Sequence, residues 1–346
     1  MISFESDYNN GMLSEILEAF GKTNSEKTSG YGFDPYSKAA KEKIRKAVGN
    51  ENADVFFLVG GTQTNTTVID SLLLGCEGVI CVETGHIEVH ESGAVEAFGH
   101  KVIPLPGENS KLSSSTLASY MDSFLAYETH PHMVQPGMVY ISMPTEFGMV
   151  YTQEELTALY ATCQKYGLRL FIDGARLGYG LESEACDYDL PFLAKHCDVF
   201  YIGGTKVGAM MGEAVVFSGM KAPKYFFTTV KRHGALLAKG RMLGIQFDTL
   251  FTDQLYFKVA RHAIAMAARI RGIFKKHSIA IAYDSPTNQQ FVVLSPTLHE
   301  ALSKRVAFEI WERKSDTEII CRFVTSWATK EEELDELDHI LDELDS

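Results

Sequence analysis

The chain has 346 residues, of which 45% are hydrophobic and 22% are charged, and these proportions are typical of a globular protein with a sizeable core. Its length favours roughly two domains. The formal net charge of −13 argues against a nucleic-acid or anionic-membrane partner, because both require a basic protein surface.

The cysteines and the amino terminus bear on the cellular compartment. The six cysteines form no C-x-x-C pair, so neither a zinc site nor a disulfide framework is indicated. The opening run MISFESDYNNG lacks the basic and apolar parts of a signal peptide. No uncharged apolar segment reaches the ~18 residues that a membrane span needs. The sequence therefore predicts a reduced, soluble, cytoplasmic protein without membrane or nucleic-acid partners.

Short apolar runs alternate with helical spacings from residue 55 to residue 217. Such runs suit strands of a sheet that is covered on both faces, with crossover helices between them. Strands are predicted at 55–59, 78–82, 102–104, 138–143, 168–172, 199–202 and 214–217. Helices are predicted at 64–74, 89–98, 114–127 and 153–166. This alternation predicts an α/β fold with a mainly parallel sheet, whose ligands bind beyond the carboxyl ends of the strands.

The carboxyl-terminal part follows another pattern. A long helical pattern at 249–277 leads into it. The predicted order is then strand 290–294, helix 297–304, strand 306–311, strand 319–324 and helix 330–344. The last helix carries its leucines along one face, as a packing helix does. We expect a large α/β domain over 1–245, with an amino-terminal arm, and a connecting helix with a small α+β domain over 246–346.

The first candidate site is the run GGTQTN at 60–65, which follows a predicted strand and opens a predicted helix. Its glycines let a ligand approach the backbone, and the amino end of a helix offers free N–H groups to a phosphate. Thr62 can add a hydroxyl group. The run matches neither the dinucleotide fingerprint nor the Walker pattern. It is therefore either an ordinary turn or a phosphate site of another kind.

Two histidines, His86 and His90, lie four residues apart beside Glu88 and Glu91. The order differs from the H-E-x-x-H zinc motif, and no third ligand is evident nearby, so we predict no metal site. An imidazole that follows a strand can instead lie flat on an aromatic cofactor.

Asp173 ends an apolar strand, where side chains face the ligand crevice. A carboxylate there needs a cationic partner, because an unpaired buried charge is unfavourable. Two interpretations are open. Arg176 either forms a structural ion pair with Asp173, or both residues face a ligand, with Asp173 beside a cationic ring nitrogen and Arg176 gripping an anion.

Lys206 lies inside the otherwise apolar and glycine-rich run 198–217. A buried lysine whose pKa falls becomes a nucleophile, whereas a lysine in an ordinary loop extends its ammonium group into water. Arg322, in the apolar strand 319–324, also has two possible roles. It either reaches water at a sheet edge or binds a carboxylate in the cleft between the domains.

Taken together, these motifs suit one cofactor. A phosphate cradle, a carboxylate, a flat side chain and a lysine are the groups that pyridoxal 5′-phosphate needs.

These motifs also resemble one family. In this order and spacing, the chain is similar to the low-specificity threonine aldolase and β-eliminating lyase family of fold-type-I pyridoxal-phosphate enzymes, which have an aspartate-aminotransferase-like fold with a seven-stranded sheet. The matching motifs are FESD at 4–7, YGFDPYS at 31–37, GGTQTN at 60–65, GHIEVHESG at 85–93, DGARL at 173–177, GGTKVGAMMGEAV at 203–215 and CRFVT at 321–325.

The resemblance implies a role for each matching residue. Lys206 would bond covalently to the cofactor aldehyde, Asp173 would hold the proton on the ring nitrogen, and His86 would stack on the ring. Gly61 and Thr62 would bind the phosphate. The further residues implied to contact the cofactor are Arg176, Thr205 and Arg241.

The resemblance also implies substrate residues and an assembly. Ser6, Arg176 and Arg322 would orient the carboxylate of an amino acid substrate. Arg241, in KGRMLG at 239–244, matches a region that reaches the phosphate of a neighbouring subunit. Members of the family are homodimers or homotetramers with composite active sites, so the same is expected here.

Glu146 is a departure from the best-known threonine aldolases, which carry a histidine at the matching place. In SMPTEFGMVYT at 142–152 it can act as a catalytic base, accept a hydrogen bond from another substrate group, or be structural.

The sequence is compatible with three functions. The first is cleavage of L-threonine, L-allo-threonine or a related β-hydroxy amino acid to glycine and an aldehyde; the others are β-elimination or transamination, and a binding protein without activity.

Overall fold

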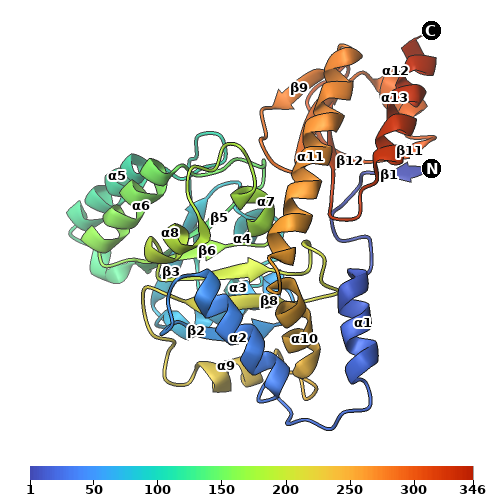
Figure 1. Cartoon of the computed structure of the whole chain (residues 1–346). Coiled ribbons are helices and arrows are strands. Elements are labelled where there is room, and N and C mark those ends of the chain that lie inside the picture. The colour runs from blue at the N-terminus through green and yellow to red at the C-terminus, as the bar shows by residue number, and fades with distance from the viewer. Residues whose placement is uncertain (346) are drawn as a thin grey trace.

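The central sheet has seven strands, and all seven were predicted (Figure 1). The computed structural model describes residues 1–345. The strands are β2 (Asp54–Leu58), β3 (Glu77–Val82), β4 (Val102–Leu105), β5 (Gln135–Ser142), β6 (Arg169–Asp173), β7 (Val199–Gly203) and β8 (Glu213–Phe217). Their order across the sheet is β2-β8-β7-β6-β5-β3-β4. Strand β8 runs antiparallel to both of its neighbours, so its amino end lies at the edge where the other strands have their carboxyl ends.

Helices cover both faces of this sheet, which explains why its strands read as continuous apolar runs. Every residue of β7 and β8 is buried. One face packs on α3 (Gly61–Leu72) and α9 (Phe226–Arg232). The opposite face packs on α2 (Pro35–Ala47), α5 (Ser114–Ala126), α6 (Gln153–Lys165), α8 (Leu190–Lys195) and α10 (Arg241–Leu250).

Two predicted helices are wrong in their extent. The helix predicted at 89–98 is a single turn, α4 (His86–Val89), followed by a 3-10 turn at Glu96–Phe98. Ser92 and Gly93 have positive φ angles of 55° and 72°, which no helix can contain. The helix predicted at 249–277 starts too early. Its first two residues end α10, and α11 (Leu255–Lys276) begins only after Asp253 and Gln254, which also have positive φ angles, 48° and 58°.

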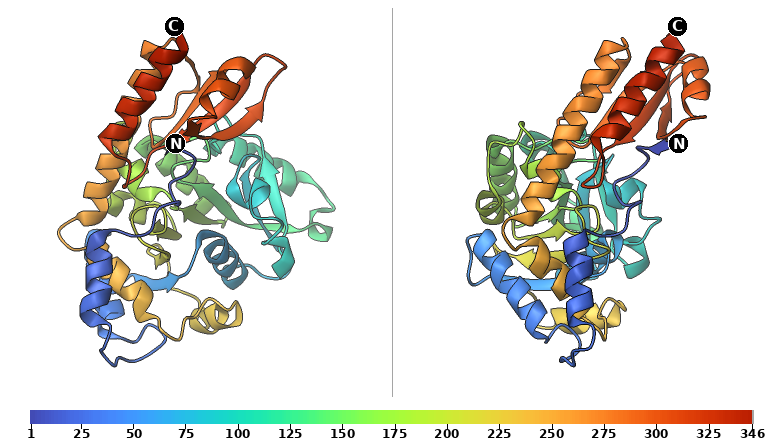
Figure 2. Two further views of the ribbon diagram at one scale, coloured as in Figure 1. Left: turned by 90° about the vertical axis from the view of Figure 1, so that its right-hand side faces the viewer. Right: turned by 45° about the vertical axis from the view of Figure 1, so that its right-hand side comes forward.

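A second, four-stranded antiparallel sheet stands above the first (Figure 2). Its order is β12 (Glu309–Arg313), β13 (Ile319–Val324), β10 (Gln289–Leu294) and β9 (Ala280–Tyr283). The strand predicted at 306–311 is divided, because β11 (Val306–Ala307) leaves this sheet and pairs with the amino-terminal β1 (Ile2–Ser3). The amino-terminal arm therefore packs with the carboxyl-terminal part, and the domain boundary at 245 stays a prediction.

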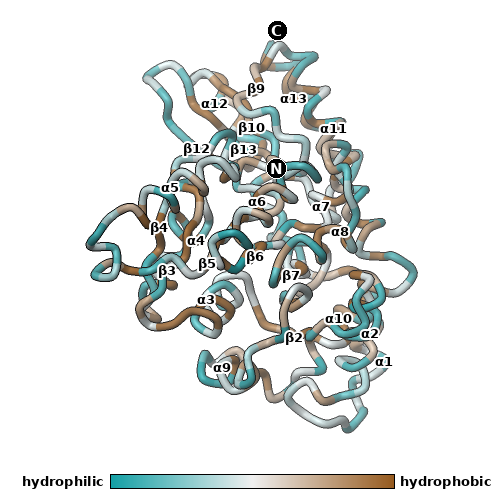
Figure 3. Tube along the Cα trace, turned by 90° about the vertical axis from the view of Figure 1, so that its left-hand side faces the viewer, coloured by the Kyte–Doolittle hydropathy of each residue, from teal (hydrophilic) through white to brown (hydrophobic). Residues whose placement is uncertain are grey.

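Helix α11 and the last helix, α13 (Glu331–Asp345), pack together beside the second sheet. Hydrophobic and hydrophilic residues alternate along both helices (Figure 3). The helix α12 (Pro296–Leu302) lies next to α13. No helix was predicted from the sequence at α1 (Ser14–Thr23), α2, α7 (Leu177–Leu181), α8, α9 or the first eight residues of α10. Within residues 1–345, no helix combines the length and the apolar character needed to cross a lipid bilayer.

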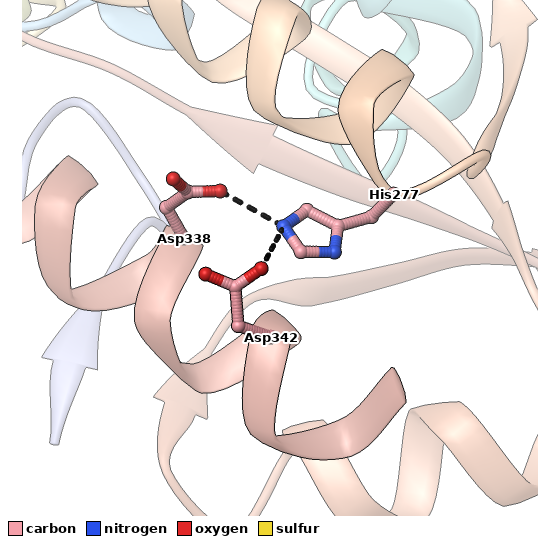
Figure 4. Close-up of side chains that lie close together, drawn as sticks. All are labelled: His277, Asp338 and Asp342. Atoms are coloured by element: carbon pink, nitrogen blue, oxygen red, sulfur yellow. Dashed lines mark hydrogen bonds and ion pairs between the residues drawn. The ribbon is translucent and has the colours of Figure 1, made fainter. Parts of the chain in front are cut away.

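A charged cluster joins the ends of α11 and α13 (Figure 4). His277 Nε2 lies 2.8 Å from Asp338 and 3.7 Å from Asp342, and its Nδ1 lies 2.6 Å from Asp345. The side chains of His277, Asp338 and Asp342 are close enough to hold a metal ion. The ammonium group of Lys276, however, already lies 2.9 Å from Asp338 and 3.1 Å from Asp342, so the cluster is an ion-pair network.

This network predicts a pH dependence of stability. Burial of the His277 ring opposes its charge, but hydrogen bonds with Asp345 and Asp338 outweigh burial and raise the pKa of His277. A raised pKa in the folded state stabilises the protein fully below the unfolded value of 6.5, and this stabilisation is lost as the pH rises through the folded pKa. We expect His277→Gln to lower the free energy of unfolding by about 0.5–1 kcal/mol at pH 6 and by less at pH 9.

Thermal unfolding of both proteins at the two pH values measures this difference. The exposed His132 provides a matched control, since His132→Gln removes an imidazole without a carboxylate cluster around it. Equal destabilisation by His277→Gln at both pH values would contradict the assignment of the charge to His277.

Candidate active site

A cavity of about 230 Å³ lies at the edge of the central sheet where β5, β6 and β7 end and α3 and β8 begin. This is the edge at which ligands bind in sheets of this type. Most of the residues predicted from the sequence line it together. They are Gly61, Thr62, His86, Glu146, Asp173, Arg176, Thr205 and Lys206.

Lys206 enters this cavity from the turn between β7 and β8. Its backbone is fixed by the hydroxyl group of Tyr179, which donates a hydrogen bond of 2.5 Å to the Lys206 carbonyl. The side chain is only partly exposed, and its ammonium group lies 5.8 Å from the centre of the Tyr8 ring. Burial, together with the nearby charge of Arg176, lowers the pKa of Lys206. The amine is thus more readily neutral, and so nucleophilic, than an ordinary lysine.

Asp173 is held by four neutral donors. The hydroxyl groups of Tyr140 and Tyr201 each donate at 2.5 Å, the side-chain amide of Asn65 at 3.0 Å and the backbone N–H of Ala175 at 2.9 Å. Burial disfavours the charged carboxylate, but the charge of His86 and these hydrogen bonds outweigh it and lower the pKa of Asp173. The cavity therefore contains a fixed anion, which can accept a hydrogen bond from a protonated ring nitrogen.

His86 belongs to a hydrogen-bonded chain that leads to Asp173. Its Nδ1 lies 2.8 Å from Glu91 Oε1, and the side-chain amide of Asn65 donates to the same oxygen at 2.7 Å. Burial opposes the charged ring, yet the hydrogen bond with Glu91 and the charges of Glu146 and Asp173 raise the pKa of His86. Sequence reasoning missed Asn65 and Glu91 as site residues, although both lie within the motifs GGTQTN and GHIEVHESG.

Arg176 forms its ion pair with Asp7, so the interpretation that it pairs with Asp173 is wrong. Its Nε lies 2.7 Å from Asp7 Oδ2 and its Nη2 lies 3.1 Å from Oδ1. Asn288 also donates to Asp7 at 2.9 Å. Because Asp7 occupies one edge of the planar guanidinium group, the Nη1 edge remains for a ligand. Asp7 and Asn288 were not predicted, since both are far from Arg176 in the sequence.

Glu146 lies in the loop after β5, at the cavity wall. The loop is closed by a hydrogen bond of 2.8 Å from the Thr145 N–H to the Met149 carbonyl. The Gln289 side chain reaches it from the second sheet and donates to the Glu146 carbonyl at 3.4 Å. The negative charge of the Glu146 carboxylate favours the charged forms of His86 and Lys206, which line the same cavity, and so acts to raise the pKa of each.

Three predicted residues do not line the cavity. Ser6 lies in the amino-terminal arm, where its hydroxyl oxygen accepts a hydrogen bond of 3.3 Å from the Tyr8 N–H. Arg322 is buried on β13, where it donates to Gln289 at 2.9 Å and pairs with Glu309. Arg241 donates to the carbonyl groups of Thr23 and Glu26 at 2.6 and 3.0 Å. The roles of Ser6 and Arg322 toward a substrate, and of Arg241 toward a neighbouring subunit, stay predictions.

The amino end of α3 forms the remaining wall. Gly60 precedes the helix in an extended conformation, and the first N–H groups of any helix lack partners within it. A side chain at Gly61 would place its Cβ 3.2 Å from the Tyr201 hydroxyl group, so the close packing favours glycine there. Thr62 is exposed at this end, and Thr205 lies opposite, on the lysine turn. The arrangement offers N–H and hydroxyl donors to an anion.

Comparisons with known proteins agree with this geometry. The family model described as "Beta-eliminating lyase" matches residues 4–297. The chain is 32% identical to the low-specificity L-threonine aldolase of a Pseudomonas species, over 96% of this chain and 95% of that protein. It is 38% identical to Leishmania major threonine aldolase, with a TM-score of 0.96 and 100% of both chains covered. A mutant of Thermus thermophilus aspartate aminotransferase, 15% identical with a TM-score of 0.73, shares the fold over 99% of this chain and 91% of that one, which confirms the predicted fold class.

Proposed function

Since the chain belongs to the beta-eliminating lyase family, we propose that it is an aldehyde-lyase which cleaves L-threonine, L-allo-threonine or a related β-hydroxy amino acid to glycine and an aldehyde. The observation that carries this proposal is the partly buried Lys206 amine, which lines one cavity with the fixed carboxylate of Asp173 and the guanidinium of Arg176. The names of the Pseudomonas and Leishmania relatives support the choice of substrate.

We further propose pyridoxal 5′-phosphate as the cofactor. The residues of the cavity fit each part of it: the amino end of α3 with Thr62 and Thr205 offers donors to a phosphate, Asp173 is an acceptor for a protonated ring nitrogen, and Lys206 is a nucleophile for an aldehyde. When bound, this cofactor supplies a carbonyl carbon for the substrate amine and a ring that accepts electrons from the breaking bond.

The chain's own residues orient the substrate and move its protons. The Nη1 edge of Arg176 would bind the substrate carboxylate and so fix the orientation of the bonds at the substrate Cα. Asp173 keeps a proton on the ring nitrogen, because its carboxylate is held ionised by four donors. Glu146, which lines the same cavity, would take the proton of the β-hydroxyl group. The neutral Lys206 amine exchanges a proton at Cα.

Product analysis tests this function against its alternatives. The purified protein, supplied with pyridoxal phosphate, is incubated with L-threonine, L-allo-threonine and larger β-hydroxy amino acids. We expect an aldehyde and glycine in equal amounts from at least one of them. Pyruvate or an equivalent keto acid with ammonia would indicate β-elimination, and consumption of an added keto acid would indicate transamination. A protein that binds the cofactor but yields none of these products would contradict an enzymatic role.

A homodimer or homotetramer with composite active sites is part of the same proposal. Within one chain, Arg241 and the segment 23–30 enclose a hollow of about 560 Å³ that is separate from the Lys206 cavity. In a composite site, this region of one subunit would complete the phosphate site of another, as the resemblance implies for Arg241.

A further inference from the structure

A second buried carboxyl group, that of Glu213, lies in the wall of the cavity and has no role in the proposed chemistry. Glu213 is the first residue of β8 and is paired with Leu58 of β2 and Gly203 of β7. Only 3% of it is exposed. Its position at the start of the antiparallel strand places its carboxyl group beside the turn that carries Lys206.

The Glu213 carboxyl group contacts this turn at two points. Oε2 accepts a hydrogen bond of 3.1 Å from the Gly204 N–H, and Oε1 lies 2.8 Å from the Thr205 hydroxyl oxygen. The Thr205 hydroxyl oxygen also accepts a hydrogen bond of 3.0 Å from the Gly212 N–H. Because a hydroxyl group has one hydrogen and two lone pairs, the direction of the contact between Thr205 and Glu213 depends on where the proton is.

The protonation state of Glu213 decides whether the Thr205 hydroxyl group can donate a hydrogen bond to a ligand. If Glu213 is ionised, Thr205 must donate its single hydrogen to it, and no hydrogen remains for Thr205 to donate to an anionic ligand. If Glu213 is neutral, its own O–H donates to Thr205, and both lone pairs of the Thr205 hydroxyl are then used. The hydrogen of Thr205 is in that case free to point into the cavity, toward the amino end of α3.

We propose that Glu213 is a positioning residue which, as a neutral acid, donates to Thr205 and frees the Thr205 hydroxyl hydrogen for an anionic group bound at the amino end of α3. The anion meant is the cofactor phosphate, so the inference rests on the proposed function. A neutral acid suits this place for a second reason, since an ionised carboxylate beside a phosphate would repel it.

The electrostatics of the site support a neutral Glu213. Burial raises the pKa of Glu213, whereas the hydrogen bonds from Thr205 and Gly204 and the charge of Lys206 lower it. Burial has the larger effect, and the pKa of Glu213 is raised to about 8. The ionised Asp173 acts in the same direction as burial. The two tyrosines within reach, Tyr201 and Tyr256, have pKa values raised by burial, and therefore remain neutral.

The test measures the affinity of pyridoxamine 5′-phosphate, which has no aldehyde and therefore cannot bond to Lys206. Binding is titrated at pH 7 and pH 9, where the phosphate stays a dianion because its second pKa is about 6. The key variant is Glu213→Gln, whose side-chain amide donates to Thr205 at every pH, as the neutral acid does. We expect it to bind like the wild type at pH 7 and about tenfold more tightly than the wild type at pH 9.

Comparison with this variant removes the effect of other groups that titrate in the same range, Lys206 among them. Thr205→Val lacks the hydroxyl group and should bind about tenfold more weakly than the wild type at pH 7, with little difference at pH 9. Asp198→Asn is the matched control: Asp198 is also a buried carboxylate that accepts a backbone N–H, at 2.7 Å from Leu170, but it lies at the opposite end of β7. The affinity of this variant for pyridoxamine 5′-phosphate should change between pH 7 and pH 9 as that of the wild type does.

Equal weakening of the wild type and Glu213→Gln between pH 7 and pH 9 would overturn the inference. So would unchanged binding by Thr205→Val at pH 7. Failure of the proposed function looks different, because the wild type would then not bind pyridoxamine phosphate at either pH, and both proposals would be wrong.

Discussion

Replacement of Lys206 by alanine is expected to lower the rate of aldehyde release by at least about 10³-fold. The amine has two tasks, since it both bonds to the cofactor and exchanges a proton with the substrate, and no other lysine lines the cavity in the described chain. The wild type mixed with pyridoxal phosphate should show a visible absorbance band. After borohydride reduction, mass spectrometry should find the cofactor attached to residue 206, and the variant should show neither signal.

Lys41 provides a matched control for this experiment. It lies on α2 over the rings of Phe56 and Phe57, and burial lowers its pKa as it lowers that of Lys206. Lys41→Ala should keep the band, the attachment at residue 206 and the activity, because a lowered pKa alone does not make a lysine catalytic. A visible band and aldehyde release that survive in Lys206→Ala would show that the cofactor is held by another group.

The sequence predicted the cavity because its central residues stand at the ends of strands. Asp173 is the last residue of β6, and Lys206 follows β7 by three residues. Neighbouring parallel strands bring their carboxyl ends to one edge, so the apolar runs predicted that Asp173 faces the ligand crevice. Gly61 and Thr62 were predicted by the same reasoning, since they begin the helix after β2. That Lys206 faces the crevice too was predicted only from the combination of motifs that suits one cofactor and from the resemblance to the family.

Contacts between distant segments could not be predicted in this way. Asp7 stands in the amino-terminal arm, Arg176 in the large sheet domain and Asn288 beside the second sheet, and no periodicity relates such positions. Glu213 shows the same limit: an apolar strand pattern gives no sign of whether its first residue points at a turn or at solvent. The helix break at 253–254 was missed because neither Asp253 nor Gln254 is a glycine or a proline.

Removal of the ion pair between Asp7 and Arg176 is expected to lower the stability of the fold substantially. Both side chains are almost completely buried, with exposed fractions of 0% and 8%. Burial opposes the charge of Asp7, but the charges of Arg176 and Lys206 and the hydrogen bonds from Arg176 and Asn288 together outweigh it and lower the pKa of the carboxyl group. Asp7→Ala leaves the guanidinium group buried without its counter-ion, which is expected to lower the free energy of unfolding by about 3–5 kcal/mol. Denaturant unfolding of both proteins measures this loss.

The same variant should impair substrate binding, because Asp7 fixes the plane in which Arg176 presents its free edge. In Asp7→Ala, KM for threonine should rise more than kcat falls, provided that the assay is run at a temperature where the variant is folded. Asn288→Ala is the matched control, since it removes a neutral donor from Asp7 and leaves the ion pair in place. Its free energy of unfolding should fall by less, about 1.5–3 kcal/mol, for the hydrogen bond to the charged Asp7 and the one that the same amide donates to the Thr325 carbonyl at 2.9 Å. Equal losses from the two variants would mean that Asp7 is held by packing and that Arg176 does not depend on its charge.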